Sequence, residues 1–352
     1  MKRILALALA LVMLFALTAC GTAAPADSST NTNGETEAPA AAEAEAYTII
    51  IGNTGSEQCS DYAGATAFKE YVEKESNGRL QVQLLFNGVL GSDRETLEST
   101  QMGSCTMMST GLTQYTNFVK ELTALDGPFM FETAEDVYNL FADEQFVETL
   151  NGLFATAKYK YMGMSFQGFR TLTSNREVHS MADMKGMTIR VIESATPMAL
   201  WTALGANPTP LAFTEVYTAL QQGTVDAQEN PLELIYSQRF YEQQKYIVNT
   251  NHQIQPLFLS MNLDFYNNLP DDLKTIVDAG CEEYVKAARA YSEQMLETYK
   301  QTMTDAGCTF IDVEPDDFAD MYEATASVRA SLAEQYPEFS AVLNDAITRT
   351  QG

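Results

Sequence analysis

The chain has 352 residues and carries 47 acidic against 21 basic side chains, a formal net charge of -26 at pH 7. Nucleic-acid binding requires a basic face, and anionic lipid headgroups attract basic segments. The charge balance therefore excludes a nucleic-acid partner and argues against adsorption to a membrane surface. Residues 47–352 are long enough for one large or two medium domains.

The N-terminus carries an export signal. Lys2 and Arg3 precede an apolar run that ends in LTAC, and this run is shorter than the roughly 20 apolar residues of a transmembrane helix. The pattern predicts a signal peptide over residues 1–19. A resemblance to bacterial lipoproteins implies a lipid on Cys20; a plain secretory signal is the alternative. Residues 20–46, this cysteine and its tether, contain no aromatic residue and no aliphatic residue larger than alanine, which predicts disorder.

Strand and helix patterns alternate through the first part of the remaining chain. Apolar alternation marks the strands, and apolar spacing of three and four residues marks the helices. The order strand, helix, strand, helix predicts an α/β fold with parallel sheets covered by helices. The predicted elements are a strand over residues 47–53, a helix over 61–76, a strand over 79–86 and a helix over 92–102 that Ser92 and Glu95 cap.

The same order begins again with a strand over residues 187–192 and a helix over 195–204, which suggests a second α/β lobe. In that strand Arg190 lies on the opposite side from Ile189 and Val191. A guanidinium buried there needs an anion. Later segments are mostly helical, and the longest predicted helix covers residues 271–305.

Two helix starts are predicted between these segments. Thr214 can cap a short helix that ends at Gly223, where a left-handed residue is expected. Asn230 precedes Pro231, with Glu233 three positions on, and is predicted to be the N-cap of the next helix. The apolar positions of the first helix are Val216, Ala219 and Leu220.

Signatures of catalysis are missing from the sequence. His179 and His252 are the only histidines, and there is no HExxH, paired CxxC, GxSxG or phosphate-loop motif. We therefore expect no enzyme activity, no metal and no cofactor. Acidic residues are numerous enough for a hydrolytic pair, but no spacing selects two of them. His252 is predicted to satisfy a local hydrogen bond.

Four cysteines follow Cys20. An even number in an exported protein allows one or two disulfides, although free buried thiols are an equal alternative. The pair to test first is the last two, which flank a helix and a turn. The four are Cys59, Cys105, Cys281 and Cys308.

Several ordered motifs between residues 47 and 270 together resemble the DctP-type solute-binding proteins of TRAP transporters. They include FKEYVEKESNGRLQVQLLFNGVLGSDRETL, LDGPFMF, GFRTLTSNREVHSMADMKG, the block DMKGMTIRVI to QENP, and FYEQQKYIVNTNH. The resemblance implies a two-lobed, periplasmic-binding-protein-like α/β fold with a ligand cleft between the lobes. Lobe I would comprise residues 47–167 with about 256–295, and lobe II residues 168–255 with about 296–352.

The resemblance also implies a binding site. Arg190 would form a bidentate pair with a ligand carboxylate, and Arg170, Asn230 and Phe213 would line the same cleft. For Arg170 a salt bridge between the lobes is the alternative, and for Asn230 a pure helix cap. The other side of the cleft would contain Thr54, Asp93 and Gly111.

The resemblance narrows the class of ligand only in part. A relative that binds an acidic sugar has a glutamate at the position of Gly111, so sialic acid is disfavoured. Sugar acids, keto acids, dicarboxylates and carboxylated aromatics remain open. The implied function is a lipid-anchored extracytoplasmic receptor that delivers a small organic acid to TRAP permease subunits. A receptor that feeds a sensor or another transporter is the second hypothesis, and an exported hydrolase the third.

Overall fold

The computed structural model of the protein describes residues 45–351, which belong to one compact unit. The predicted signal peptide, the lipid expected on Cys20 and the predicted tether up to residue 44 lie outside the described residues. Across residues 45–351, no helix combines the length and the apolarity that crossing a bilayer requires.

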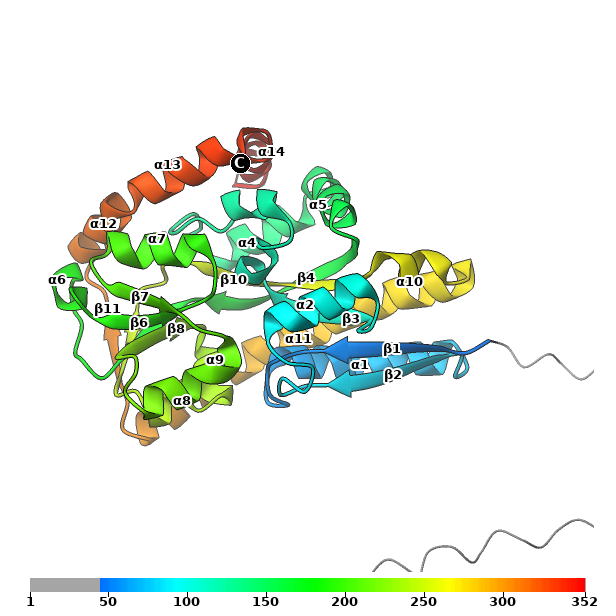
Figure 1. Cartoon of the computed structure of the whole chain (residues 1–352), viewed down its shortest axis with the longest axis horizontal. Helices are drawn as coiled ribbons and strands as arrows, with labels where there is room; N and C mark the ends of the chain where they lie inside the picture. Colours follow the sequence, from blue (N-terminus) through cyan, green and yellow to red (C-terminus); the bar gives the residue numbers. More distant parts are fainter. Residues whose placement is uncertain (1–44, 352) are drawn as a thin grey trace, which may run out of the picture. The chain divides into compact units, whose positions relative to one another are not determined.

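Two mixed sheets organise the fold (Figure 1). In the first sheet, β1 pairs in parallel with β2 and β3, whereas β10 runs antiparallel to β3 and β4. Its strand order is β2-β1-β3-β10-β4. The strands are β1 (Tyr47–Gly52), β2 (Leu80–Leu85), β3 (Met107–Gly111), β4 (Tyr159–Phe169) and β10 (Ile254–Asn262).

The second sheet has the order β11-β9-β5-β8-β6-β7. Strand β6 pairs in parallel with β7 and β8, and β5 runs antiparallel to β8 and β9. The strands are β5 (Thr171–Ser174), β6 (Thr188–Val191), β7 (Asn207–Pro210), β8 (Ala227–Asn230), β9 (Tyr246–Asn249) and β11 (Thr309–Asp312).

The α/β class is as expected. Strands β1 and β2 pair in parallel as predicted, but the expectation of parallel sheets throughout was wrong, because both sheets also contain antiparallel pairs. The chain passes between the sheets from β4 to β5, from β9 to β10, and along α11 (Asp271–Asp305). A strand that enters from the other sheet is not part of a local strand-helix-strand unit, so it is free to run antiparallel. Strands β5 and β10 take this direction.

Helices cover both sheets, and several of the helix ends predicted from the sequence are present in the structure. Ser92 and Glu95 form the predicted capping box, and Gly223 has φ of +66°. The helices are α1 (Ser60–Glu75), α2 (Asp93–Met102), α3 (Leu112–Tyr115), α4 (Ala134–Ala142), α5 (Glu144–Thr156), α6 (Met181–Met184), α7 (Ala195–Ala203), α8 (Val216–Gln221), α9 (Leu232–Ser237), α10 (Leu263–Asn268), α12 (Pro315–Ala324), α13 (Ala326–Gln335) and α14 (Pro337–Gln351). The short 3-10 turns are η1 (Lys120–Ala124), η2 (Phe213–Glu215) and η3 (Phe240–Glu242).

Both other predicted caps were wrong. Thr214 lies inside the 3-10 turn η2, and its side chain does not cap α8, which follows Glu215. Asn230 is the last residue of β8, and α9 begins after Pro231 without a side-chain cap. A tertiary contact explains the second case, because the Asn230 carboxamide is hydrogen-bonded to Arg170 and Gln228 instead.

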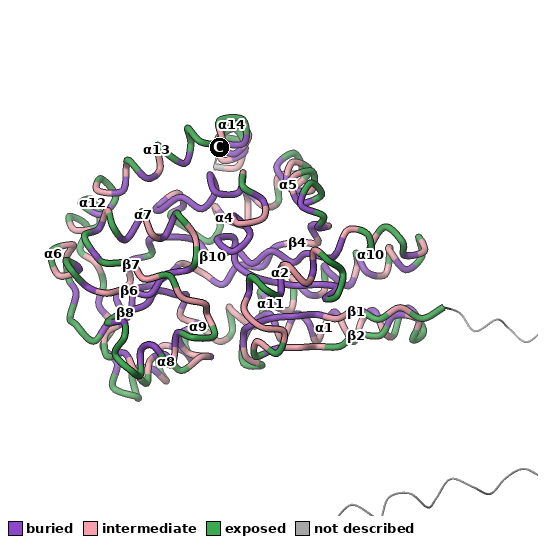
Figure 2. The backbone as a smooth tube through the Cα atoms, viewed as in Figure 1, coloured by how far each residue is buried: buried purple, intermediate pink, exposed green. Residues whose placement is uncertain are grey.

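Two long-range packing contacts position the sheets. Helix α11 contributes Val277 and Tyr284 to the core of α1, β1 and β2, and Tyr299 to a second core with α8 and α9. Helix α14, from the segment expected in lobe II, packs Phe339 and Leu343 against α4 and α5 beside the first sheet. Figure 2 shows the central strands β8 and β10 buried and the outer helices alternating between buried and exposed residues.

All four described cysteines are free and buried. The suggested pairing of Cys281 with Cys308 was wrong. Cys281 lies in α11, with about 24 helical residues between it and the end of that helix at Asp305. At about 1.5 Å per residue these span roughly 36 Å, whereas a disulfide needs Cα atoms within about 7 Å.

Candidate functional site

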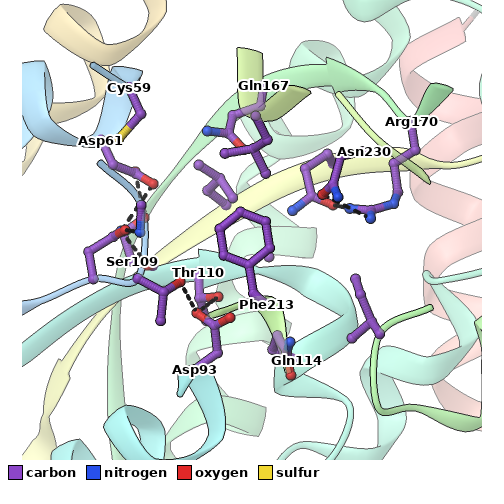
Figure 3. A pocket seen from close by; sticks show the side chains of 18 of the residues that line it. Cys59, Asp61, Asp93, Ser109, Thr110, Gln114, Gln167, Arg170, Phe213 and Asn230 are labelled. Carbon is purple, nitrogen blue, oxygen red and sulfur yellow. Dashed lines mark hydrogen bonds between the residues drawn. The ribbon is translucent and has the colours of Figure 1, made fainter. Parts of the chain in front are cut away.

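One cavity is lined by residues from both sheets and their connections (Figure 3). Its volume is at most about 500 Å³, because this figure includes the part that is open to solvent. Only a small molecule fits in a cavity of this size. All seven residues predicted from the sequence line it. They are Thr54, Asp93, Gly111, Arg170, Arg190, Phe213 and Asn230.

Strand ends bring these residues together. Thr54 follows β1 and Gly111 ends β3, and these two strands are parallel. Arg190 is the penultimate residue of β6 and Asn230 ends the parallel strand β8. Open α/β sheets bind ligands outside the carboxyl ends of their strands, and here two such edges face one cavity.

Arg190 is buried with one nitrogen unsatisfied. Its side chain is 1% exposed, and Nε and Nη2 donate to the Leu211 carbonyl over 3.0 and 2.7 Å. Nη1 has no hydrogen-bond partner among residues 45–351. Burial lowers the pKa of the guanidinium to about 10, so it stays charged at neutral pH. The cavity therefore presents a cation with a free donor.

Arg170 is also buried, but its charge is neutralised. The guanidinium forms a bidentate salt bridge with Glu229 and also donates to Gln255 and Asn230. Burial opposes ionisation of Glu229, yet Arg170 and His252 outweigh it and hold the pKa of Glu229 at about 2. Arg170 thus lines the cavity and forms a salt bridge at the same time.

His252 makes the local hydrogen bonds predicted for it. Its side chain is fully buried; Nδ1 lies 2.8 Å from the Thr250 hydroxyl and Nε2 lies 3.1 Å from Glu229. Burial lowers the pKa of the imidazole. The histidine supports Glu229 and is not among the residues that line the cavity.

Asp93 lies on the opposite wall. One of its oxygens, Oδ1, accepts hydrogen bonds from the hydroxyls of Thr54 and Thr110 over 2.8 and 3.0 Å. Within residues 45–351 no hydrogen bond reaches Oδ2. Burial raises the pKa of the carboxyl, and the two threonines and Arg190 oppose this rise.

Phe213 and Gly111 shape the space. The Phe213 ring centroid lies 6.0 Å from the Arg190 guanidinium carbon, so the ring forms an apolar wall beside the cation. A Cβ on Gly111 would come within 2.4 Å of Nε2 of Gln255. Glycine at this position therefore makes room for the Gln255 carboxamide.

Several polar residues of the cavity escaped the sequence analysis. Asn53 is the last residue of the predicted strand over residues 47–53, so its position could have suggested it. Gln114, Gln167 and Gln255 carry no comparable signal. The further polar lining residues are Asn53, Asp61, Ser109, Thr110, Gln114, Gln167 and Gln255.

No group of three or more His, Cys, Asp or Glu side chains in the described part of the chain is arranged to hold a metal ion. Two mixed α/β sheets that share one polar cavity, with a free buried cation in it, define a binding protein of the two-lobed type. The profile of the bacterial extracellular solute-binding proteins, family 7 (DctP), matches residues 51–335. The chain belongs to this family, whose members are extracytoplasmic substrate-binding receptors.

Individual proteins similar to this chain are also solute-binding proteins. A solute-binding protein of Verminephrobacter eiseniae is 36% identical over 60% of this chain and 64% of the relative. The C4-dicarboxylate-binding periplasmic protein DctP of Rhodobacter capsulatus is 31% identical over 77% of this chain and 78% of the relative. A solved TRAP periplasmic solute-binding protein from Bordetella bronchispeptica, with density assigned to pantoate, has a TM-score of 0.80 and 32% identity, covering 87% of this chain and 99% of that one.

Proposed function

We propose that this chain is the extracytoplasmic solute receptor of a TRAP transporter and binds a small organic acid between its lobes. It delivers the acid to the permease subunits and performs no catalysis. The relatives support this assignment, because one is named for a C4-dicarboxylate and one solved structure carries density assigned to pantoate. Both ligands are carboxylic acids.

One observation carries the proposal. Nη1 of Arg190 is buried, belongs to a charged group and has no hydrogen-bond partner among residues 45–351, in a cavity lined by both sheets. Leaving a buried donor unsatisfied costs about 1 to 3 kcal/mol, and more when the group is charged. A ligand carboxylate removes that cost and accepts from a planar fork that matches its own geometry.

The neighbouring residues complete the site. Arg170 adds little net charge, since Glu229 neutralises it, and instead fixes the position of the Asn230 carboxamide. Asn230 then contacts the ligand beside Arg190, and Phe213 covers its apolar surface. Thr54, Asp93 and Gly111 form the wall that selects among acids.

We assign lobe I to residues 47–167 with about 256–295, and lobe II to residues 168–255 with about 296–336. The contacts of α14 with α4 and α5 favour placing residues 337–352 with lobe I rather than lobe II. The cavity then lies between the lobes.

Native mass spectrometry tests the function. Protein purified from its exporting host should carry one carboxylic acid per chain, and Arg190→Lys should lose it, because lysine cannot form the bidentate pair. The expected loss of affinity is about 3 to 5 kcal/mol, or roughly two to four decades in Kd. Arg94→Lys, at an exposed position, is the control. A neutral or cationic bound molecule, or unchanged binding in Arg190→Lys, contradicts the proposal.

The lipid anchor is proposed from the sequence alone. With LTAC as a lipobox, the exported wild type should partition into detergent with the membrane fraction. Cys20→Ser should not mature as a lipoprotein, while its folded part keeps the same melting temperature. Equal solubility of both proteins after export contradicts the anchor.

A further inference from the structure

The free polar groups of the cavity restrict the class of acid that fits, provided that Arg190 holds the carboxylate as proposed. Asp93 is 7% exposed, and the two threonine hydroxyls occupy only its Oδ1 atom. Figure 3 shows this carboxylate beside Thr110 on the wall near Phe213. Its Oδ2 atom is the acceptor left for a donor on the occupant.

A second carboxylate on the ligand would find no cation. Among residues 45–351, the cations that line the cavity are Arg170 and Arg190, and Arg170 is paired with Glu229. Asp61 adds another carboxylate to the wall, with its oxygens occupied by Ser109, Tyr284 and Asn53. A carboxylate near Asp93 and Asp61 would therefore meet like charges in a desolvated space.

A hydroxyl suits the free groups better than an ammonium. An ammonium has three donors to satisfy, whereas a hydroxyl has one donor and can also accept. Besides Asp93 Oδ2, the wall offers the Gln114 carboxamide, which is 7% exposed and makes no side-chain hydrogen bond within residues 45–351. One carboxamide and one carboxylate oxygen match hydroxyls on the ligand chain.

We propose that the ligand is a hydroxylated monocarboxylate, and that Asp93 selects it over dicarboxylates of the same length. Its carboxylate pairs with Arg190, and a hydroxyl donates to Oδ2 of Asp93. Further hydroxyls reach Gln114 and Nε2 of Gln255, which donates no hydrogen bond within the described part of the chain, while Oε1 of Gln255 accepts from Arg170. This specificity differs from that of the relative named for C4-dicarboxylates.

Calorimetry at neutral pH with carbon-matched acids tests the proposal. The four-carbon probes are D-erythronate, succinate, butyrate and 4-aminobutyrate, and the six-carbon probes are D-galactonate, galactarate and hexanoate. At one or both lengths the hydroxylated monocarboxylate should bind at least tenfold more tightly than every other acid of that length. Preference for a diacid, a plain acid or the amino acid overturns the proposal.

A charge-removing variant identifies the residue responsible. Asp93→Asn keeps the shape, removes the charge and adds a donor, so the preference for the hydroxy acid over the diacid should shrink at least tenfold. Asp320→Asn removes an exposed acid from α12 and should leave the preference unchanged. An unchanged preference in Asp93→Asn overturns the role of Asp93.

The receptor function and the proposed ligand class are contradicted by different results. Binding of diacids or plain acids that Arg190→Lys abolishes leaves the receptor function standing and overturns the proposed class. Failure of every acid to bind contradicts the receptor function as well.

Discussion

Arg170 and Arg190 are both buried arginines of one cavity, yet their electrostatic environments are opposite. Glu229 compensates Arg170 through two hydrogen bonds, and no carboxylate pairs with Arg190 among the described residues. Breaking a buried pair by removing one partner costs far more than removing an unpaired charge. We therefore expect the same substitution at the two positions to change the free energy of unfolding in opposite directions.

Arg190→Met should raise the free energy of unfolding of the ligand-free protein by about 1 kcal/mol, because it removes a buried cation that has no carboxylate partner among residues 45–351. The same change should abolish binding of the acid. Arg170→Met is the matched control and should lower the free energy of unfolding by about 3 to 5 kcal/mol, since it leaves Glu229 buried and unpaired. Urea denaturation measures both, and equal destabilisation by the two variants would refute this distinction.

Asp126 should make stability depend on pH. It is fully buried; Oδ1 accepts from Thr113 and Gln253, while Oδ2 has no partner among residues 45–351. Burial raises its pKa from 3.8 to about 7. The folded state thus keeps a proton that the unfolded state has lost between about pH 4 and 7, so stability falls as pH rises through this window.

The expected contribution of Asp126 is up to about 4 kcal/mol, from a shift of roughly three pKa units. Asp126→Asn should flatten the fall in the free energy of unfolding between about pH 4 and 7. Urea titrations at several pH values, with Asp320→Asn as a surface control, measure the difference. If the free energy of unfolding falls equally with pH in wild type and Asp126→Asn, a group other than Asp126 holds the proton.

At the scale of elements, Glu233 joins helices that the sequence places far apart. It is buried in α9, and its Oε1 accepts from the Ser60 amide at the start of α1 over 2.9 Å and from Gln167 of β4 over 2.6 Å. Oε2 accepts from Ser292 of α11 over 2.8 Å. Burial raises the pKa of this carboxyl. The contact links α9, beside the second sheet, to elements of the first.

Glu233→Ala should lower the free energy of unfolding by about 2 to 3 kcal/mol, because four donors, three of them buried, lose their acceptor. These donors are the Ser60 amide, the Ser60 hydroxyl, the Gln167 carboxamide and the Ser292 hydroxyl. It should also weaken ligand binding by favouring separation of the lobes. Glu233→Gln keeps the Oε1 acceptor, so its loss should stay below about 1 kcal/mol. Thermal denaturation and calorimetry together test this ordering, and similar losses in both variants would show that the charge matters rather than the hydrogen bonds.

At the scale of the whole molecule, ligand should favour closure of the two lobes. A ligand that contacts both walls stabilises the closed form only by its greater affinity for that form. Small-angle scattering should give a smaller radius of gyration at saturation. The unfolding free energy should rise with ligand concentration, by about 2.7 kcal/mol at 100 times Kd. A scattering curve that ligand leaves unchanged would remove closure from the mechanism while leaving binding intact.

The sequence predicted local elements well. The bounds of β1, α1, α2 and α7 agree within about a residue, and those of α11 agree in full, because apolar periodicity and end signals act within a few residues. It failed where distant residues compete for the same side chain. Asn230 has a good N-cap sequence, yet its carboxamide bonds Arg170 instead, and β10 runs antiparallel because it returns from the other sheet.

By itself, the sequence determined the α/β class, the family and the seven candidate site residues, since each depends on local pattern or on motifs in order. Only the tertiary structure decided that Gln255 fills the space beside Gly111 and that Arg170 has a carboxylate partner. It also decided that, within residues 45–351, Nη1 of Arg190 and Oδ2 of Asp93 have no hydrogen-bond partner. The physical reason is that charge compensation and hydrogen-bond saturation depend on which side chains meet across strands and sheets. No spacing along the chain records those meetings.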